Sequence, residues 1–84
     1  MEKSIFKREY KVFTTLLRES REKAGLTQAA LAEKVRQSQS YISKWERGEL
    51  RLDLVQLGEL CRAMRVSLSS FVIEFERRSS RKQA

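Results

Sequence analysis

The stretch from Thr27 to Gly48 constrains the fold of this chain most, because it predicts two short helices separated by a tight break. Leu31 and Val35 give its first half an apolar stripe at helical spacing. Thr27 and Ser38 precede the two halves as natural N-caps, since a hydroxyl there accepts a hydrogen bond from an amide of the first turn. The pattern therefore predicts a helix, a sharp turn and a second helix.

The second predicted helix has two faces of different chemistry. Ile42 and Trp45 point to the core side, and core packing of Trp45 is favoured over base stacking. The opposite face carries amides, hydroxyls and cations: Gln39, Ser40, Ser43, Lys44 and Arg47. Such groups hydrogen-bond base edges and phosphates of double-stranded DNA. The alternative interpretation is an all-helical domain with no role in DNA binding.

This segment resembles the helix-turn-helix of the lambda-repressor/Cro-like family of bacterial and phage regulators, also called the XRE family. The resemblance extends from about Phe13 to Phe71 and implies an all-α fold, a compact bundle of five helices. Its motif residues, at the family's spacing, are Gln28, Leu31, Ala32, Val35, Ile42 and Trp45, with Gly25 before them and Gly48 after.

Two residues depart from the family pattern. Arg36 stands in the turn where glycine is usual, and Gln37 stands where an apolar residue is usual. A non-glycine residue with a left-handed backbone costs about 1 kcal/mol. The sequence therefore allows a turn whose geometry differs from that of the family.

The resemblance implies that the second helix enters the major groove with its first residues nearest the bases. Base contacts are then expected from Gln39, Ser40, Ser43 and Lys44. Phosphate contacts are expected from Gln28, Arg36, Gln37, Ser38, Tyr41, Arg47 and Arg51. In the family, the glutamine at the position of Gln28 also braces the one at the position of Gln39, and we expect that pair here. Each cation has a solvated surface charge as its alternative, and Tyr41 can instead pack on the domain surface.

The 84 residues predict one helix-turn-helix domain, with a core over about 10–76 and a basic tail, 77–84, that frays. The net charge of +7 favours a polyanionic partner, although charge alone also fits RNA or an anionic membrane surface. The basic residues Lys3, Lys7 and Arg8 are either an arm along the duplex or a solvated surface.

Several residue types are absent or rare, and this narrows the function. There is no histidine, and Cys61 is the only cysteine, so a metal site built from thiolate and imidazole ligands is excluded and no cofactor is expected. Cys61 has an apolar helical position and is expected in the core. With no histidine and only this one cysteine, an enzyme is the least favoured class of protein. The charged start of the chain predicts neither a signal peptide nor a membrane span, and hence a cytoplasmic, nucleoid-associated protein.

The rest of the chain predicts three further helices. The first runs from near Tyr10 or earlier to Ala24, with an inward stripe (Phe13, Leu16, Leu17, Ser20 and Ala24) and outward cations (Arg18, Arg21 and Lys23). Asp53 and Gln56 form a capping box for a helix that ends near Met64. A last helix follows from Leu68 through Glu76.

The last predicted helix has more apolar residues than one stripe can bury. We expect a dimer interface on it, formed by Phe71, Val72, Ile73 and Phe75. The leading hypothesis is a sequence-specific transcriptional regulator that binds an inverted repeat in double-stranded DNA as a homodimer. The alternative is an antitoxin or controller-type protein that binds a partner protein, such as a toxin, through this helix.

Overall fold

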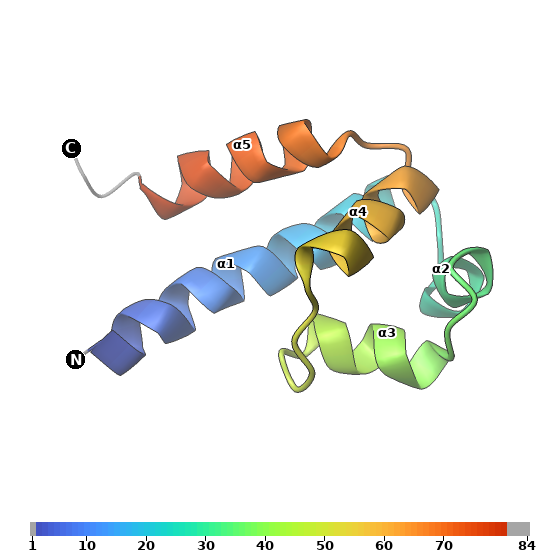
Figure 1. Ribbon diagram of the computed structural model, residues 1–84, viewed down its shortest axis with the longest axis horizontal. Helices are drawn as coiled ribbons and strands as arrows, with labels where there is room; N and C mark the ends of the chain where they lie inside the picture. Colours follow the sequence, from blue (N-terminus) through green and yellow to red (C-terminus); the bar gives the residue numbers. More distant parts are fainter. Residues whose placement is uncertain (1, 81–84) are drawn as a thin grey trace.

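Five helices make up the fold in the computed structural model, which describes residues 2–80 (Figure 1). They are α1 (Glu2–Lys23), α2 (Gln28–Lys34), α3 (Gln39–Glu46), α4 (Leu54–Ala63) and α5 (Leu68–Ser79). Residues 2–80 contain no strand, so the predicted all-α bundle of five helices is confirmed. α1 begins well before Tyr10, and α5 continues through residues 77–79 of the predicted tail. Residues 81–84 of that tail lie outside the described part.

Each of the four later helices begins at a side-chain cap. Thr27, Ser38, Asp53 and Ser67 each accept a hydrogen bond from the amide three residues on. The predicted capping box is also present: the Gln56 amide donates to Asp53 Oδ1, and the Asp53 amide donates to Gln56 Oε1, both at 2.8 Å. These caps satisfy amides that a helix start leaves without partners, so local sequence sets where the helices begin.

The turn between α2 and α3 has a left-handed residue, as the family glycine would supply. Arg36 has φ 59°, and the following amide, of Gln37, donates to the Ala32 carbonyl at 2.9 Å. The same closure follows α4, where Arg65 has φ 64°. Two arginines therefore adopt a backbone conformation that favours glycine. The turn before α3 keeps its usual geometry although Arg36 stands in place of the family's glycine.

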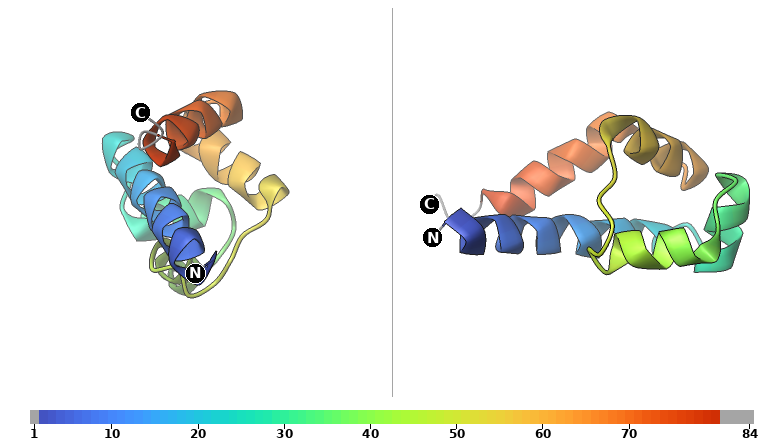
Figure 2. Two further views of the ribbon diagram at one scale, coloured as in Figure 1. Left: turned by 90° about the vertical axis from the view of Figure 1, so that its left-hand side faces the viewer. Right: turned by 60° about the horizontal axis from the view of Figure 1, so that its bottom comes forward.

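The core lies where α1 packs against α3 and α5, while α2 packs on α3 and α4, and α4 packs on α5 (Figure 2). Its buried apolar residues are Leu16, Leu17, Leu31, Ala32, Ile42, Trp45, Leu57, Leu60, Cys61, Met64 and Phe71. The predictions for Trp45 and Cys61 are confirmed, and burial raises the pKa of the Cys61 thiol. Within residues 2–80, no helix combines the length and the apolar character that crossing a bilayer requires.

The predictions for Phe71 and Ala24 are wrong. Phe71, expected in a dimer interface, is buried in the core, with its ring edge-on to Phe13 at a centroid distance of 5.9 Å. Ala24, expected in the inward stripe of α1, is exposed because the helix ends at Lys23 and the chain turns away there. Leu16 and Leu17 of that stripe are buried as predicted.

Candidate nucleic-acid interface

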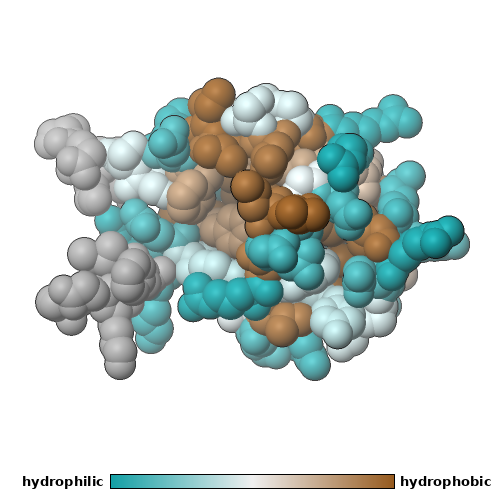
Figure 3. All heavy atoms as spheres, in the orientation of Figure 1, coloured by the Kyte–Doolittle hydropathy of each residue, from teal (hydrophilic) through white to brown (hydrophobic). Residues whose placement is uncertain are grey.

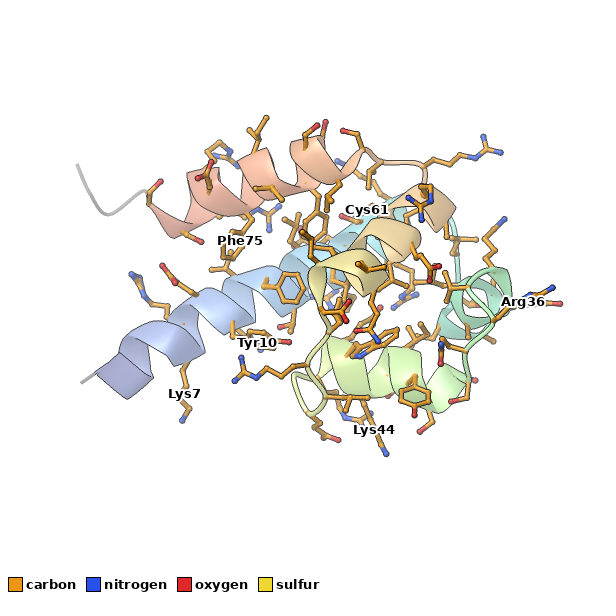
Figure 4. The ribbon with its side chains drawn as sticks, in the orientation of Figure 1. Lys7, Tyr10, Arg36, Lys44, Cys61 and Phe75 are labelled. Carbon is orange, nitrogen blue, oxygen red and sulfur yellow. The ribbon has the colours of Figure 1, made fainter. Side chains whose placement is uncertain are left out.

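The outward face of α3 carries the predicted base-reading side chains. Ile42 and Trp45 are buried and hold the helix against the core. On the other side, Gln39, Ser40 and Lys44 are exposed, whereas Ser43 is half-buried. Figure 4 shows Lys44 pointing away from the bundle. The structure therefore brings the four residues together on one helix, with three of them open to a ligand.

The turn before α3 exposes three predicted phosphate contacts, Arg36, Gln37 and Ser38. The Ser38 hydroxyl is engaged as the N-cap, where it accepts from the Tyr41 amide at 3.2 Å. Tyr41 is exposed, and its ring lies 5.8 Å from that of Trp45. Tyr41 thus packs partly on the domain surface while its edge stays open to solvent.

Arg47, at the end of α3, is held by a neighbouring carboxylate. Its Nε and a terminal nitrogen donate to the two Glu49 oxygens at 2.9 and 3.0 Å, and its other terminal nitrogen donates to Ser43 Oγ. The hydrogen bonds and charge of this pair raise the pKa of Arg47 and lower that of Glu49. Both groups are exposed, so solvent screens this ion pair and makes it weak. A phosphate can therefore displace Glu49 as the partner of Arg47.

Arg51, the last predicted phosphate contact, lies against α1. Its guanidinium carbon is 4.1 Å above the centre of the Tyr10 ring, a cation–π contact. The residue is exposed, in the connector between α3 and α4. Its cation is therefore positioned beside α1, at the end of α3.

A buried ion pair fixes the end of α3 to α1 and was missed by the sequence analysis. Arg21, expected to point outward, is buried, and its Nε and second terminal nitrogen donate to Glu46 at 2.6 and 3.2 Å. The remaining terminal nitrogen donates to the Leu26 carbonyl at 2.8 Å. One signal for this placement existed: Arg21 follows Leu17 by four residues and so continues the inward stripe.

The same carboxylate also holds Gln28, the first residue of α2. Gln28 Nε2 donates to Glu46 Oε1 at 3.0 Å. This bond uses one of the two donors of the Gln28 amide nitrogen, so the expected brace from Gln28 to Gln39 stays a prediction. Glu46 therefore joins α1, α2 and α3 in one network.

The remaining predicted dimer residues differ in exposure. Phe75 is half-buried against Phe13, whereas Ile73 is 64% exposed and Val72 is also exposed. Leu54 and Val55, at the start of α4, are 65% and 73% exposed. Figure 3 shows apolar atoms gathered over α4 and α5 on the face turned to the viewer.

Comparison with known proteins identifies the same helix-turn-helix that the geometry shows. The family model described as helix-turn-helix matches residues 17–71. An XRE-family like protein from Pseudomonas syringae pv. tomato str. DC3000 is 33% identical, with a TM-score of 0.83 over 89% of this chain and 92% of that one.

A second similar structure is the clp gene regulator ClgR from Corynebacterium glutamicum. It is 28% identical, with a TM-score of 0.77 over 89% of this chain and 80% of that one. Another structure of ClgR is 31% identical, with a TM-score of 0.73 over 81% and 87% of the two chains. No curated protein sequence matches the chain. In the described residues, no group of three or more histidine, cysteine, aspartate or glutamate side chains is arranged to hold a metal ion.

Proposed function

The chain belongs to the XRE family of helix-turn-helix DNA-binding transcriptional regulators, and we propose that it binds an inverted repeat as a homodimer, reading the major groove with residues 38–47. The observation that carries this proposal is the outward face of α3. Exposed Gln39, Ser40 and Lys44 stand on a helix whose other side is buried. Gln bonds adenine and Lys bonds guanine in the major groove, each good pair contributing ~1–3 kcal/mol of discrimination.

The network at Glu46 supports base reading because it makes α3 a rigid element. Arg21 and Gln28 bind that carboxylate from α1 and α2, so the helix is held at its last residue as well as along its buried side. A site held by packed and hydrogen-bonded neighbours loses little freedom on binding, which favours affinity.

Phosphate contacts flank this reader in the proposal. Arg36 and Gln37 precede α3, and Arg51 follows it. Arg47 joins them when a phosphate replaces Glu49, and Gln28 offers the start of α2. These contacts position the duplex without reading its sequence.

Dimerisation follows from the small size of the module. A single small domain buries little DNA surface and binds weakly, whereas two copies place their recognition helices one turn of the duplex apart, ~34 Å. Val72 and Ile73, exposed on α5, supply apolar surface for the contact, and Leu54 and Val55 are further exposed apolar residues at the start of α4.

The experiment for base reading is a titration of a labelled genomic fragment, selected by the wild-type protein, against a random duplex. Gln39→Ala is expected to lose about 10-fold in preference for the selected fragment and to bind the random duplex as before. Ser69→Ala, which leaves the charge unchanged and removes only an exposed hydroxyl 3.3 Å from that of Ser67 at the start of α5, is the control. Equal preference in Gln39→Ala and wild type would refute the assignment of α3.

Sedimentation tests the dimer separately. Ile73→Glu places a charge on the apolar surface without touching the core, so we expect a dimeric wild type and a monomeric variant. A wild type that is monomeric at high micromolar concentration contradicts the homodimer. In that case the same apolar surface favours the alternative, an antitoxin or controller-type protein whose α5 binds a partner such as a toxin.

A further inference from the structure

The first half of α1 lies outside the part of the chain that the family model matches. That match begins at residue 17, whereas α1 begins at Glu2. Lys7, Tyr10, Lys11 and Thr14 are spaced three and four residues apart and therefore share one face of this helix. Lys7 and Lys11 are exposed, and Tyr10 is half-buried between them.

This face of α1 is turned toward the end of the recognition helix. A Cβ atom added at Gly48, just after α3, would lie 3.6 Å from two Tyr10 ring carbons and 3.9 Å from Thr14 Cγ2. Arg51 lies over the Tyr10 ring on the same connector. The two lysines consequently flank the residues through which α1 packs on the connector after α3.

The lysines also continue the cationic side of the molecule. Figure 4 shows Lys7 and Lys44 pointing to the same side, from α1 and α3 respectively. Among the described side chains, Lys7 and Lys11 make no ion pair, whereas Arg18 and Arg21 further along α1 are each bound to a glutamate. The cations near the N-terminus are thus available to a ligand that lies against α3.

We propose that Lys7 and Lys11 form a lysine ridge that binds backbone phosphates of the duplex read by α3. The proposal rests on the proposed function, because α3 places the duplex on this side. Four residues of helix rise ~6 Å, and phosphates of one strand recur every ~3.4 Å along the duplex axis, so a separation of about two phosphate steps lets each ammonium group meet a phosphate of its own. The ridge lengthens the footprint of each copy beyond the helix-turn-helix itself.

The test is the salt dependence of binding to the selected genomic fragment and to a random 30-base-pair duplex, with Lys7→Gln/Lys11→Gln as the variant. Glutamine keeps the helix propensity and removes the charge. The slope of log K against log salt is negative, and each lost phosphate contact reduces its magnitude by ~0.9. We therefore expect the slope to become less negative by about 1.8 and both affinities to drop ~10-fold or more at 0.1 M salt, with unchanged preference for the selected fragment.

Lys23→Gln is the matched control, since Lys23 is an exposed lysine of α1 about 160° around the helix from Lys7. A double variant whose slope and affinities change no more than those of this control overturns the lysine ridge. Gln39→Ala is measured in parallel to separate the two proposals. If it loses preference while the double variant matches the control, only the ridge fails; a wild type that binds neither duplex overturns both.

Discussion

Replacing Arg21 by methionine tests the buried network that fixes α3, and the structure sets the size of the effect. The side chains of Arg21 and Glu46 are only 10% and 4% exposed, and two hydrogen bonds join them. Arg21→Met leaves the Glu46 carboxylate buried with Gln28 as its remaining partner, and the Leu26 carbonyl loses its donor. Breaking a buried pair on one side costs about 3–5 kcal/mol.

That cost is large for a domain of this size. The free energy of unfolding of small domains is about 5–15 kcal/mol. Each kcal/mol that is lost lowers their melting temperature by about 4–8 °C. We therefore expect Arg21→Met to melt at least ~12 °C below the wild type. Thermal unfolding followed by circular dichroism measures the melting temperature. Urea unfolding followed by the fluorescence of Trp45, the single tryptophan and a buried one, measures the free energy of unfolding.

Two further variants decide whether the buried charge is the cause. Arg21→Met combined with Glu46→Leu removes both charges, so most of the stability is expected to return. Arg18→Met breaks an exposed pair with Glu22 and is expected to cost no more than ~0.5 kcal/mol. The reasoning is refuted if Arg21→Met lies within about 1 kcal/mol of wild type, or if the double variant is as unstable as the single one.

Three smaller effects follow from other sites. Arg36→Gly relieves the left-handed strain at φ 59° and should raise the free energy of unfolding by about 1 kcal/mol in a urea titration, while a decrease would contradict the strain. Asp53→Ala removes the capping box of α4 and should cost about 1 kcal/mol; an unchanged urea midpoint would count against it. Arg77 and Arg78 lower the pKa of Glu74 from 4.5 to about 2, so its contribution to stability is complete above pH 4.5 and is lost as the pH falls toward 2. Glu74→Gln should flatten the pH dependence of the melting temperature in that window, and parallel profiles would exclude the effect.

The sequence predicted the fold and the outward face of α3 because both depend on local patterns. Hydroxyl and carboxylate caps mark helix starts within one turn, and the buried positions of Ile42 and Trp45 follow from helical spacing. The resemblance of the motif to the XRE family was sufficient to identify that family. The roles of individual residues toward DNA remain predictions.

The errors arose where one helix meets another. Arg21 was expected outside because of its charge, but its partner Glu46 lies 25 residues away and only the packing of α1 against α3 brings them together. Gln28 binds the same carboxylate from α2, a contact that the packing of α2 against α3 brings about. Phe71 was assigned to a dimer surface because the position of Phe13 on α1 is not visible in the pattern of α5. Contacts between distant segments are the information that periodicity lacks.

The central claim is that duplex DNA occupies the outward face of α3. Amide chemical-shift mapping of the ¹⁵N-labelled protein, titrated with the selected genomic fragment, tests it most directly. We predict the largest shifts at Gln39, Ser40 and Lys44, with further shifts at Arg36 and at Gln28, the first residue of α2. Unchanged amides along α3, with the shifts gathered instead on α4 and α5, would contradict the account.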